Sequence, residues 1–326
     1  MLSGVPNHGA DHVAQPPERA VVERALDWRN DHLMHESTLY DLPALYDLVV
    51  RTGPCEAFYR DVARRTGGPI LELACGTGRL TIPLARDGHE VVALDASPLM
   101  VRSARAKAEA EMLQVTFIQG DIRDFDLGQR FPLVILCCNS LGHLTTNEDL
   151  IAGLRCISRH LAPGGLFAFD VVNPDLKSLS QPEAGCVRLD QGPNPSSGIA
   201  IEEMAAYDPV QQIRVSRLRV VEPDMRRREI APLSLRLFFP QELPLALHAA
   251  GLELAARYGD FAGNPLTAEG LNQICLARGA PAQSSRLYQG RTRCQPADDQ
   301  HDDASGSGSS LDDRSSAAGS FASSHS

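Results

Sequence analysis

The sequence predicts an α/β fold built on a doubly wound, mostly parallel sheet, and three observations predict it. Short apolar runs, each the length of one buried strand, alternate with segments of helical spacing. Small or acidic residues follow several of these runs, at the strand ends where such sheets bind ligands. At 326 residues and 43% hydrophobic content, the chain can also bury one large core.

The first unit is the stretch from Ile70 to Leu80. Its apolar start predicts a buried parallel strand, and Gly76 and Gly78 allow backbone angles and a close ligand approach that side chains would prevent. The dinucleotide fingerprint G-x-G-x-x-G would need a third Gly where Thr81 stands. The spacing is instead Glu-x-Ala-x-Gly-x-Gly over residues 72–78, so we expect a nucleotide-like ligand at this loop but not the dinucleotide fingerprint.

The next units follow in order along the chain. We expect strands at His89–Asp95, Val115–Ile122, Phe131–Ser140 and Leu166–Val172. Ser97 and Pro98 predict an N-cap and first turn of a helix that runs to about residue 113. Thr145-x-x-Glu148 predicts a capping box, for a helix that stops near Ala162–Gly165.

This succession resembles the class I S-adenosylmethionine-dependent methyltransferases over roughly residues 40–278, with Ala74 replacing the first Gly of their motif I. The resemblance implies a seven-stranded Rossmann-like sheet that ends in an antiparallel pair. Leu252–Asp260 and Leu271–Arg278 are the candidates for this pair, after a helix from Pro240 to Ala250 that stops at Gly251.

The resemblance also implies S-adenosylmethionine as the cofactor, and it assigns roles to acidic residues at the strand ends. Glu72 would lie near the ammonium end of the methionine moiety, Asp95 would bind the ribose diol, Asp121 the adenine amine, and Ile122 would pack on the base. The expected cofactor-binding residues are Glu72, Ala74, Gly76, Gly78, Asp95, Ala96, Met100, Asp121, Ile122 and Asn139.

Three residues are candidates for the chemistry itself. His143 follows the fourth strand, where the family places the substrate and the methyl group, and it is the candidate general base. Its alternative role is that of a hydrogen-bonding loop residue. Tyr40 or Tyr46 would cap the sulfonium from an N-terminal cover, or would pack within an amphipathic helix. Ser140, with Asn139, could orient the acceptor, and Asp170 and Asn173 could line the same cleft.

A β-rich insertion separates the fifth strand from the last helix, at about residues 181–240. Strands are expected at Gly198–Tyr207, Gln211–Glu222 and Arg228–Phe239, with a turn at Tyr207–Pro209. We expect an antiparallel flap over the strand ends that acts as a substrate lid. The alternative is a flap that forms a homodimer. Arg226–Arg228 is expected at a solvated hairpin tip rather than at an RNA contact.

The remaining composition bounds the organisation of the chain. We expect a disordered N-terminus (1–17), a helical cover (18–66), the catalytic domain (67–279) and a disordered tail (280–326). Six Asp and one Arg in 298–326 supply half of the net charge of −10, so the rest is only mildly acidic and no nucleic-acid surface is expected.

The eight Cys show no C-x-x-C pair, so neither a metal site nor a disulfide framework is expected. We find no membrane span or targeting signal in the sequence, and we expect a cytoplasmic protein.

Three functions remain open at this point. The first is methyl transfer to a small-molecule acceptor, with nitrogen favoured because the flap and cover resemble those of small N-methyltransferases. The second is O-methylation of a phenol or carboxylate, and a phenol would gain more than an amine from His143 as a general base. The third is a non-catalytic S-adenosylmethionine-binding protein.

Overall fold

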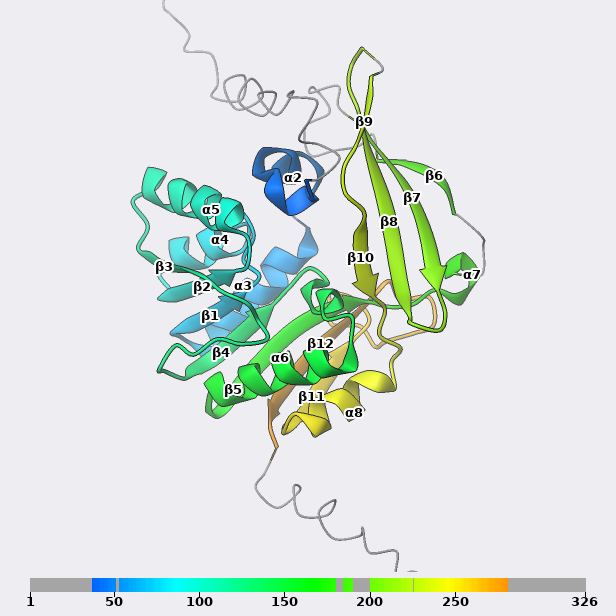
Figure 1. Ribbon diagram of the computed structural model, residues 1–326. Helices are drawn as coiled ribbons and strands as arrows, with labels where there is room; N and C mark the ends of the chain where they lie inside the picture. Colours follow the sequence, from blue (N-terminus) through cyan, green and yellow to red (C-terminus); the bar gives the residue numbers. More distant parts are fainter. Residues whose placement is uncertain (1–36, 51–52, 180–183, 190–199, 225, 281–326) are drawn as a thin grey trace, which may run out of the picture. The chain divides into compact units, whose positions relative to one another are not determined.

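The computed structural model describes residues 37–50, 53–179, 184–189, 200–224 and 226–280, all within the larger of two compact units of the chain, Met1–Ser285. A seven-stranded sheet with the order β11-β12-β5-β4-β1-β2-β3 forms its centre (Figure 1). The strands are β1 (Ile70–Leu73), β2 (Val91–Asp95), β3 (Val115–Gln119), β4 (Phe131–Leu136), β5 (Leu161–Val172), β11 (Leu252–Tyr258) and β12 (Asn272–Gly279). β1 to β5 pair in parallel, and β12 is antiparallel to both β5 and β11. The predicted fold class is therefore confirmed.

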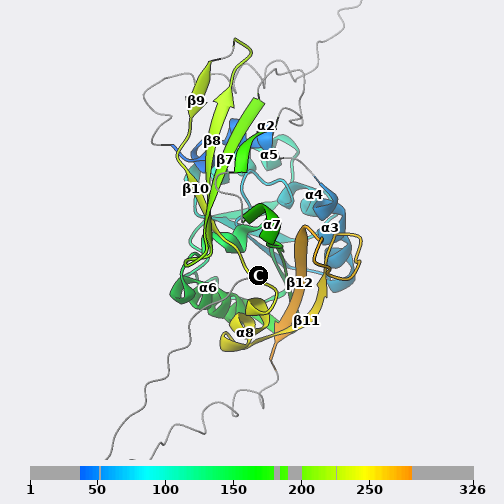
Figure 2. The same cartoon turned by 90° about the vertical axis from the view of Figure 1, so that its right-hand side faces the viewer.

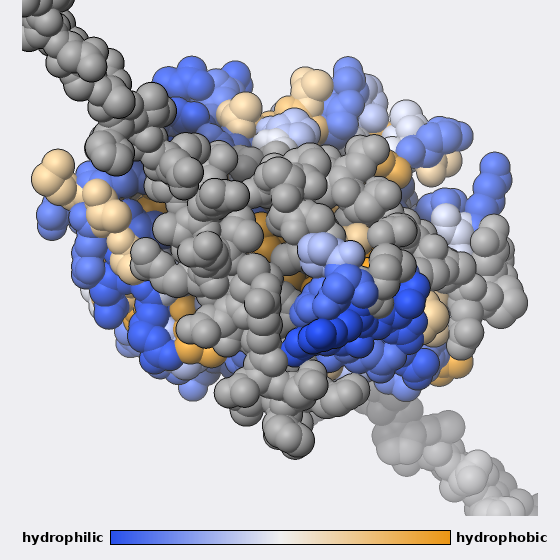
Figure 3. Space-filling model, turned by 90° about the horizontal axis from the view of Figure 1, so that it is seen from above, coloured by the Kyte–Doolittle hydropathy of each residue, from blue (hydrophilic) through white to orange (hydrophobic). Residues whose placement is uncertain are grey.

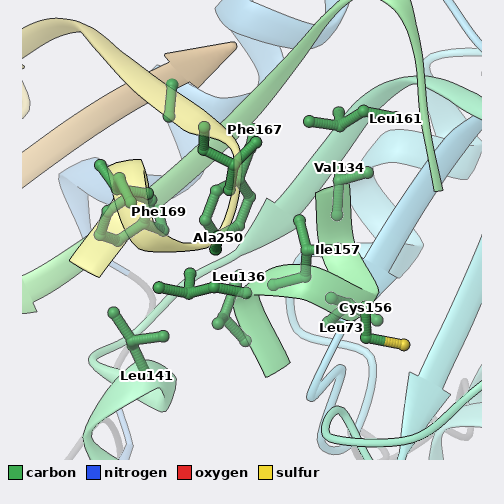
Figure 4. Packing of buried hydrophobic residues seen from close by; sticks show 14 of the residues in the cluster. Leu73, Val134, Leu136, Leu141, Cys156, Ile157, Leu161, Phe167, Phe169 and Ala250 are labelled. Carbon is green, nitrogen blue, oxygen red and sulfur yellow. The ribbon is translucent and has the colours of Figure 1, made fainter. Parts of the chain in front are cut away.

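Helices cover both faces of this sheet, which explains why its strands are apolar runs rather than alternating ones. α3 (Pro54–Thr66), α4 (Thr81–Arg86) and α5 (Pro98–Ala110) lie on one face, and α6 (Asn147–His160) and α8 (Glu242–Ala249) lie on the other (Figures 1 and 2). Successive strand residues point to opposite faces, so Ile70 and Leu71 belong to different core clusters. On the α6 face, Phe167 and Phe169 stack with ring centroids 4.7 Å apart (Figure 4).

The N-cap of α5 is the predicted residue, whereas the N-cap of α6 is not. The Ser97 hydroxyl accepts a hydrogen bond from the Met100 amide at the start of α5, as predicted. The predicted cap Thr145 is wrong, because Thr146 caps α6 by accepting from the Asp149 amide. The short helix η2 (Ser140–His143) and its C-cap Leu144 come first, so the extended cap position falls one residue later.

β5 also starts earlier than predicted. It begins at Leu161, where Phe131 of β4 is its register partner, and the register shifts before Leu133 pairs with Leu166. The segment Ala162–Gly165 thus lies within an irregular strand start rather than in a separate loop.

A second, antiparallel sheet follows β5 and α7 (Leu176–Leu179), and we call it the flap. Its order is β10 (Leu233–Arg236), β8 (Ile213–Val221), β7 (Ala200–Asp208), β6 (Ala184–Leu189), with β9 (Arg227–Glu229) also paired to β8. Asp208 closes the β7–β8 turn by accepting from the amides of Val210 and Gln211, in agreement with the predicted turn. The expected strand start at Gly198 lies outside the described residues.

The basic run after β8 is less exposed than the sequence suggests. Arg226 and Arg227 are exposed, but Arg228 pairs with Glu222 at 3.0 Å, with 9% and 8% of their side chains accessible. The expectation of a wholly solvated hairpin tip is wrong for Arg228, because β9 returns along β8 and buries it.

A short N-terminal segment, η1 (Leu39–Asp41) and α2 (Pro43–Val49), lies between the flap and the main sheet, and we call it the cover. Leu39 and Leu45 share an apolar cluster with Ile201, Val220 and Ile230 of the flap. The rest of the expected helical cover before residue 37, and both expected disordered ends, lie outside the described residues, apart from Ala280.

Other features of the described residues concern membranes, metals and thiols. None of the helices there has the length and apolar character of a membrane span, and no cluster of His, Cys, Asp or Glu there could hold a metal ion. Six Cys in this part of the chain are free thiols. Seen from above, most of the visible described surface is hydrophilic (Figure 3).

Candidate active site

A cavity of about 340 Å³ lies at the carboxyl ends of the central parallel strands, beneath the cover. The side chains and backbone that line it come from the cover, the β1, β2, β3 and β4 ends, and η2. They are Tyr40, Tyr46, Ala74, Gly76, Asp95, Ala96, Ser97, Asp121, Ile122, Arg123, Cys138, Ser140, His143 and Leu144. Strand ends on both sides of β1 thus meet at one cavity.

The β1 loop forms one wall, and its backbone is left-handed at three positions. Gly76 and Gly78 have φ of 56° and 83°, which glycine adopts freely. Ala74 has φ of 51°, a conformation that costs an alanine on the order of 1 kcal/mol. A Cβ on Gly78 would approach Ala104 to 3.2 Å, so this glycine also lets the loop pack on α5.

Asp95 fixes this loop to the end of β2. Its Oδ2 accepts from the Gly76 amide at 2.7 Å, and its Oδ1 accepts from the Ser97 amide at 2.9 Å. Burial raises the pKa of the Asp95 carboxyl, and these two amides oppose that rise. The carboxylate therefore lines the cavity in a fixed orientation.

Asp121 and Ile122 follow β3 at the next strand end. Arg123 donates from Nη2 to Asp121 Oδ2 at 2.6 Å and from Nη1 to Asp149 at 3.2 Å. The Arg123 guanidinium lowers the pKa of the Asp121 carboxyl, so this carboxylate is ionised beside the apolar Ile122.

Tyr40 of the cover and His143 of η2 meet in the lining of the cavity. The Tyr40 hydroxyl lies 2.9 Å from His143 Nε2, and their rings pack edge to face. Burial raises the pKa of Tyr40 to about 12 and lowers the pKa of His143. Near neutral pH the pair is a phenol beside a neutral imidazole, so Tyr40 can donate to Nε2 when the ring proton is on Nδ1.

Comparisons with known proteins show the family of the chain. Residues 70–165 match the family model of a methyltransferase domain. The ubiquinone biosynthesis O-methyltransferase of Cereibacter sphaeroides (strain ATCC 17025 / ATH 2.4.3) is 30% identical over 181 residues, which are 54% of this chain and 71% of the relative. The chain belongs to the class I S-adenosylmethionine-dependent methyltransferases.

Two further methyltransferases resemble the chain over a longer range. The cypemycin N-terminal methyltransferase of a Streptomyces species is 29% identical over 64% of this chain and 82% of the relative. The solved CcbJ methyltransferase from Streptomyces caelestis is 29% identical, with a TM-score of 0.65 over 76% of this chain and 100% of that one. Two other curated relatives match the chain over only about half of their length, 53% and 54%.

The residues of this methyltransferase cavity fit the family cofactor. Gly76 has no side chain, so the loop backbone itself lines the cavity, and a Cβ there would contact the Tyr46 ring and hydroxyl from 3.6 Å. Asp95 and Asp121 present acceptor oxygens at neighbouring strand ends, which suits the ribose diol and the adenine amine. Ile122 supplies an apolar surface in the same lining.

Of the thirteen residues predicted to bind the cofactor or to act in catalysis, nine line the cavity: Tyr40, Tyr46, Ala74, Gly76, Asp95, Ala96, Asp121, Ile122 and His143. The other four surround it. Glu72 and Met100 are buried, Gly78 packs on α5, and the Asn139 side chain accepts from the Val172 amide. Their roles toward the cofactor, like those of the nine, remain proposals.

Other cavity residues had no cofactor or catalytic role in the sequence analysis. Arg123, Cys138 and Leu144 line the cavity, as does Ser97, which was predicted only as a cap. Ser140, which was expected to orient the acceptor, also lines it. Arg123 stands two residues after Asp121, and Cys138 precedes Asn139, so nearness to the motifs was the one available signal. Asp170 and Asn173 are buried instead of lining the cleft, and Asn173 donates to the Gly270 carbonyl.

Proposed function

We propose that this protein transfers a methyl group from S-adenosylmethionine to a nitrogen of a small molecule. One observation carries the proposal: a single cavity is lined by Gly76, Asp95 and Asp121, the proposed donor wall, and by the hydrogen-bonded pair Tyr40 and His143. S-adenosylmethionine supplies a methyl group already activated by its sulfonium. The protein then needs to align the acceptor and keep water away.

Each residue has a proposed part in this alignment. Asp95 and Asp121 hold the donor, and the cover shields it through Tyr46, whose ring lies over Gly76. Tyr40 and His143 contact the acceptor, and a neutral imidazole can take a proton directly or through the Tyr40 hydroxyl. An amine that arrives unprotonated needs a proton acceptor only after it has attacked the methyl group.

The names of several relatives support nitrogen as the acceptor atom. The cypemycin enzyme is named for an amino terminus, and dimethyltransferases of amino sugars from Streptomyces venezuelae and Streptomyces fradiae also match part of the chain. O-methylation is the second candidate, because the Tyr40–His143 pair would suit a phenol and because the relative from Cereibacter sphaeroides is an O-methyltransferase.

A variant series tests the two acceptor classes. Pools of small amines and phenols are incubated with labelled S-adenosylmethionine and the wild-type, His143→Ala or Tyr40→Phe protein. We expect transfer to an amine, with each variant reducing kcat less than about 10-fold, since general base catalysis is worth about 10²- to 10⁴-fold where it is required. S-adenosylhomocysteine titrations serve as the control for an intact donor site.

The outcomes separate the alternatives. Transfer to a phenol with a loss of 100-fold or more in His143→Ala would replace N-methylation by O-methylation. Donor binding without transfer to either pool would favour a non-catalytic binding protein.

A further inference from the structure

The turn after β4 holds an unfavourable backbone at the wall of the cavity. Cys138 and Asn139 are consecutive left-handed residues, with φ of 62° and 58°. Asn adopts this region more readily than most residues, but for Cys it is strained, at a cost of order 1–2 kcal/mol. Cys138 and Ser140 line the cavity, so this turn shapes the site.

Asp170 of the neighbouring strand β5 accepts from both amides of this turn. Its Oδ1 lies 2.9 Å from the Cys138 nitrogen, and its Oδ2 lies 3.1 Å from the Asn139 nitrogen. The residue is 4% exposed, so these bonds form away from solvent. In a left-handed turn, two consecutive N–H groups can point to one carboxylate. The two hydrogen bonds therefore stabilise this strained backbone conformation.

Tyr59 of α3 in turn fixes Asp170. Its hydroxyl donates to Asp170 Oδ1 at 2.6 Å, and its ring is fully buried beside Phe58 and Phe261, with centroids 5.4 and 6.3 Å away. Packing against these two rings, which are themselves 5.9 Å apart, holds the buried phenol in place beside Asp170. A chain of contacts therefore runs from α3 through the carboxylate to the cavity wall.

We propose that Asp170, supported by Tyr59, is a positioning residue of the donor site: it holds Cys138 and Asn139 in the conformation that places Cys138 in the cavity wall. Its influence on affinity rests on the proposed donor site, but not on the acceptor class. Asp170 acts through the turn, since it does not line the cavity.

The chemistry of the carboxylate makes the proposal specific. Only a carboxylate offers an acceptor at both oxygens. Asn has the same shape, but its NH₂ group would face one of the two backbone amides and leave that amide without a partner. Asp170→Asn should therefore release the turn without opening a cavity in the core.

The test combines three variants and two measurements. Asp170→Asn removes one acceptor, Tyr59→Phe removes only the support, and Phe167→Leu is a control that disturbs the core of β5 elsewhere. Hydrogen exchange of the Cys138 and Asn139 amides reports on the turn, and calorimetric titration with S-adenosylhomocysteine reports on the donor site. All proteins are compared well below their Tm.

We expect Asp170→Asn to speed exchange at these two amides at least 10-fold and to weaken S-adenosylhomocysteine binding by a similar factor. Tyr59→Phe should show both effects at about 2- to 5-fold. If Asp170→Asn does not fold, the exchange rates and the affinity of Tyr59→Phe test the proposal. Phe167→Leu should lower the Tm and leave both readouts within 2-fold.

Two results would overturn the proposal: unchanged exchange in Asp170→Asn and Tyr59→Phe, or losses in Phe167→Leu as large as theirs. If the wild-type protein itself does not bind S-adenosylhomocysteine, the proposed function and the effect on affinity both fail. The exchange rates then still decide whether Asp170 holds the turn.

Discussion

Glu72 lies inside the protein although it occupies the acidic position of motif I. It is 1% exposed, and its Oε2 accepts from the Thr81 hydroxyl at 2.5 Å. Burial raises the pKa of Glu72 to about 8, and the Thr81 bond only partly opposes this. A substantial fraction of this carboxyl is therefore protonated at neutral pH without cofactor.

This burial has a measurable effect on stability. Between the ordinary pKa of 4.5 and about 8, folded Glu72 keeps a proton that the unfolded chain releases, so the free energy of unfolding falls as the pH rises. Glu72→Gln mimics the protonated form and lacks this dependence. In urea unfolding at pH 5.5 and 7.5, the wild-type protein should lose about 2.5 kcal/mol relative to Glu72→Gln. A difference that does not change with pH would contradict the burial of Glu72.

At the scale of elements, the cover is tied to the cofactor loop through one side chain. Asp47 accepts from the Thr77 hydroxyl at 2.6 Å and from Lys107 Nζ at 2.6 Å, so α2, the β1 loop and α5 meet there. Thr77 is buried, whereas the Lys107 and Asp47 side chains are 39% and 40% exposed. The exposed ion pair is worth little, and the bond to Thr77 is the stronger restraint.

We expect Asp47→Ala to loosen the cover and to raise the dissociation rate of S-adenosylhomocysteine about 10-fold, a change of about 1.4 kcal/mol. Lys107→Met removes the ion pair alone and should stay within 2-fold. Stopped-flow displacement measures both rates. Equal effects of the two variants would assign the restraint to the ion pair instead.

Elements were predictable where local chemistry decides them. Ser97 and Pro98 specify the start of α5, and the apolar runs specify the parallel strands, because both faces of the sheet are covered. The cap of α6 was missed by one residue, since η2 occupies the chain before it. Asp170 was expected in the cleft, and its partners Cys138 and Tyr59 are 32 and 111 residues away in sequence. No local pattern reports such a contact.

At the scale of the whole molecule, one sheet gathers the donor residues and two additions face them. β1, β2 and β3 bring Gly76, Asp95 and Asp121 together because parallel strands end on the same edge. The flap reaches this edge through β10, where the Arg236 carbonyl would lie 3.1 Å from a Cβ on Gly142 in η2. The proposed donor site therefore follows from the sheet, and the proposed acceptor side depends on the cover, η2 and the flap.

The donor site at this edge is the central claim, and a pair of glycines tests it most directly. Gly76 and Gly88 both have positive φ, 56° and 87°, so valine strains the backbone at either position. Only Gly76 lines the cavity, whereas nothing lies within 4 Å of a Cβ on Gly88. Calorimetric titration with S-adenosylhomocysteine should show a loss of at least 100-fold in Gly76→Val and a change within 3-fold in Gly88→Val. Wild-type affinity in Gly76→Val would contradict the placement of the donor in this cavity.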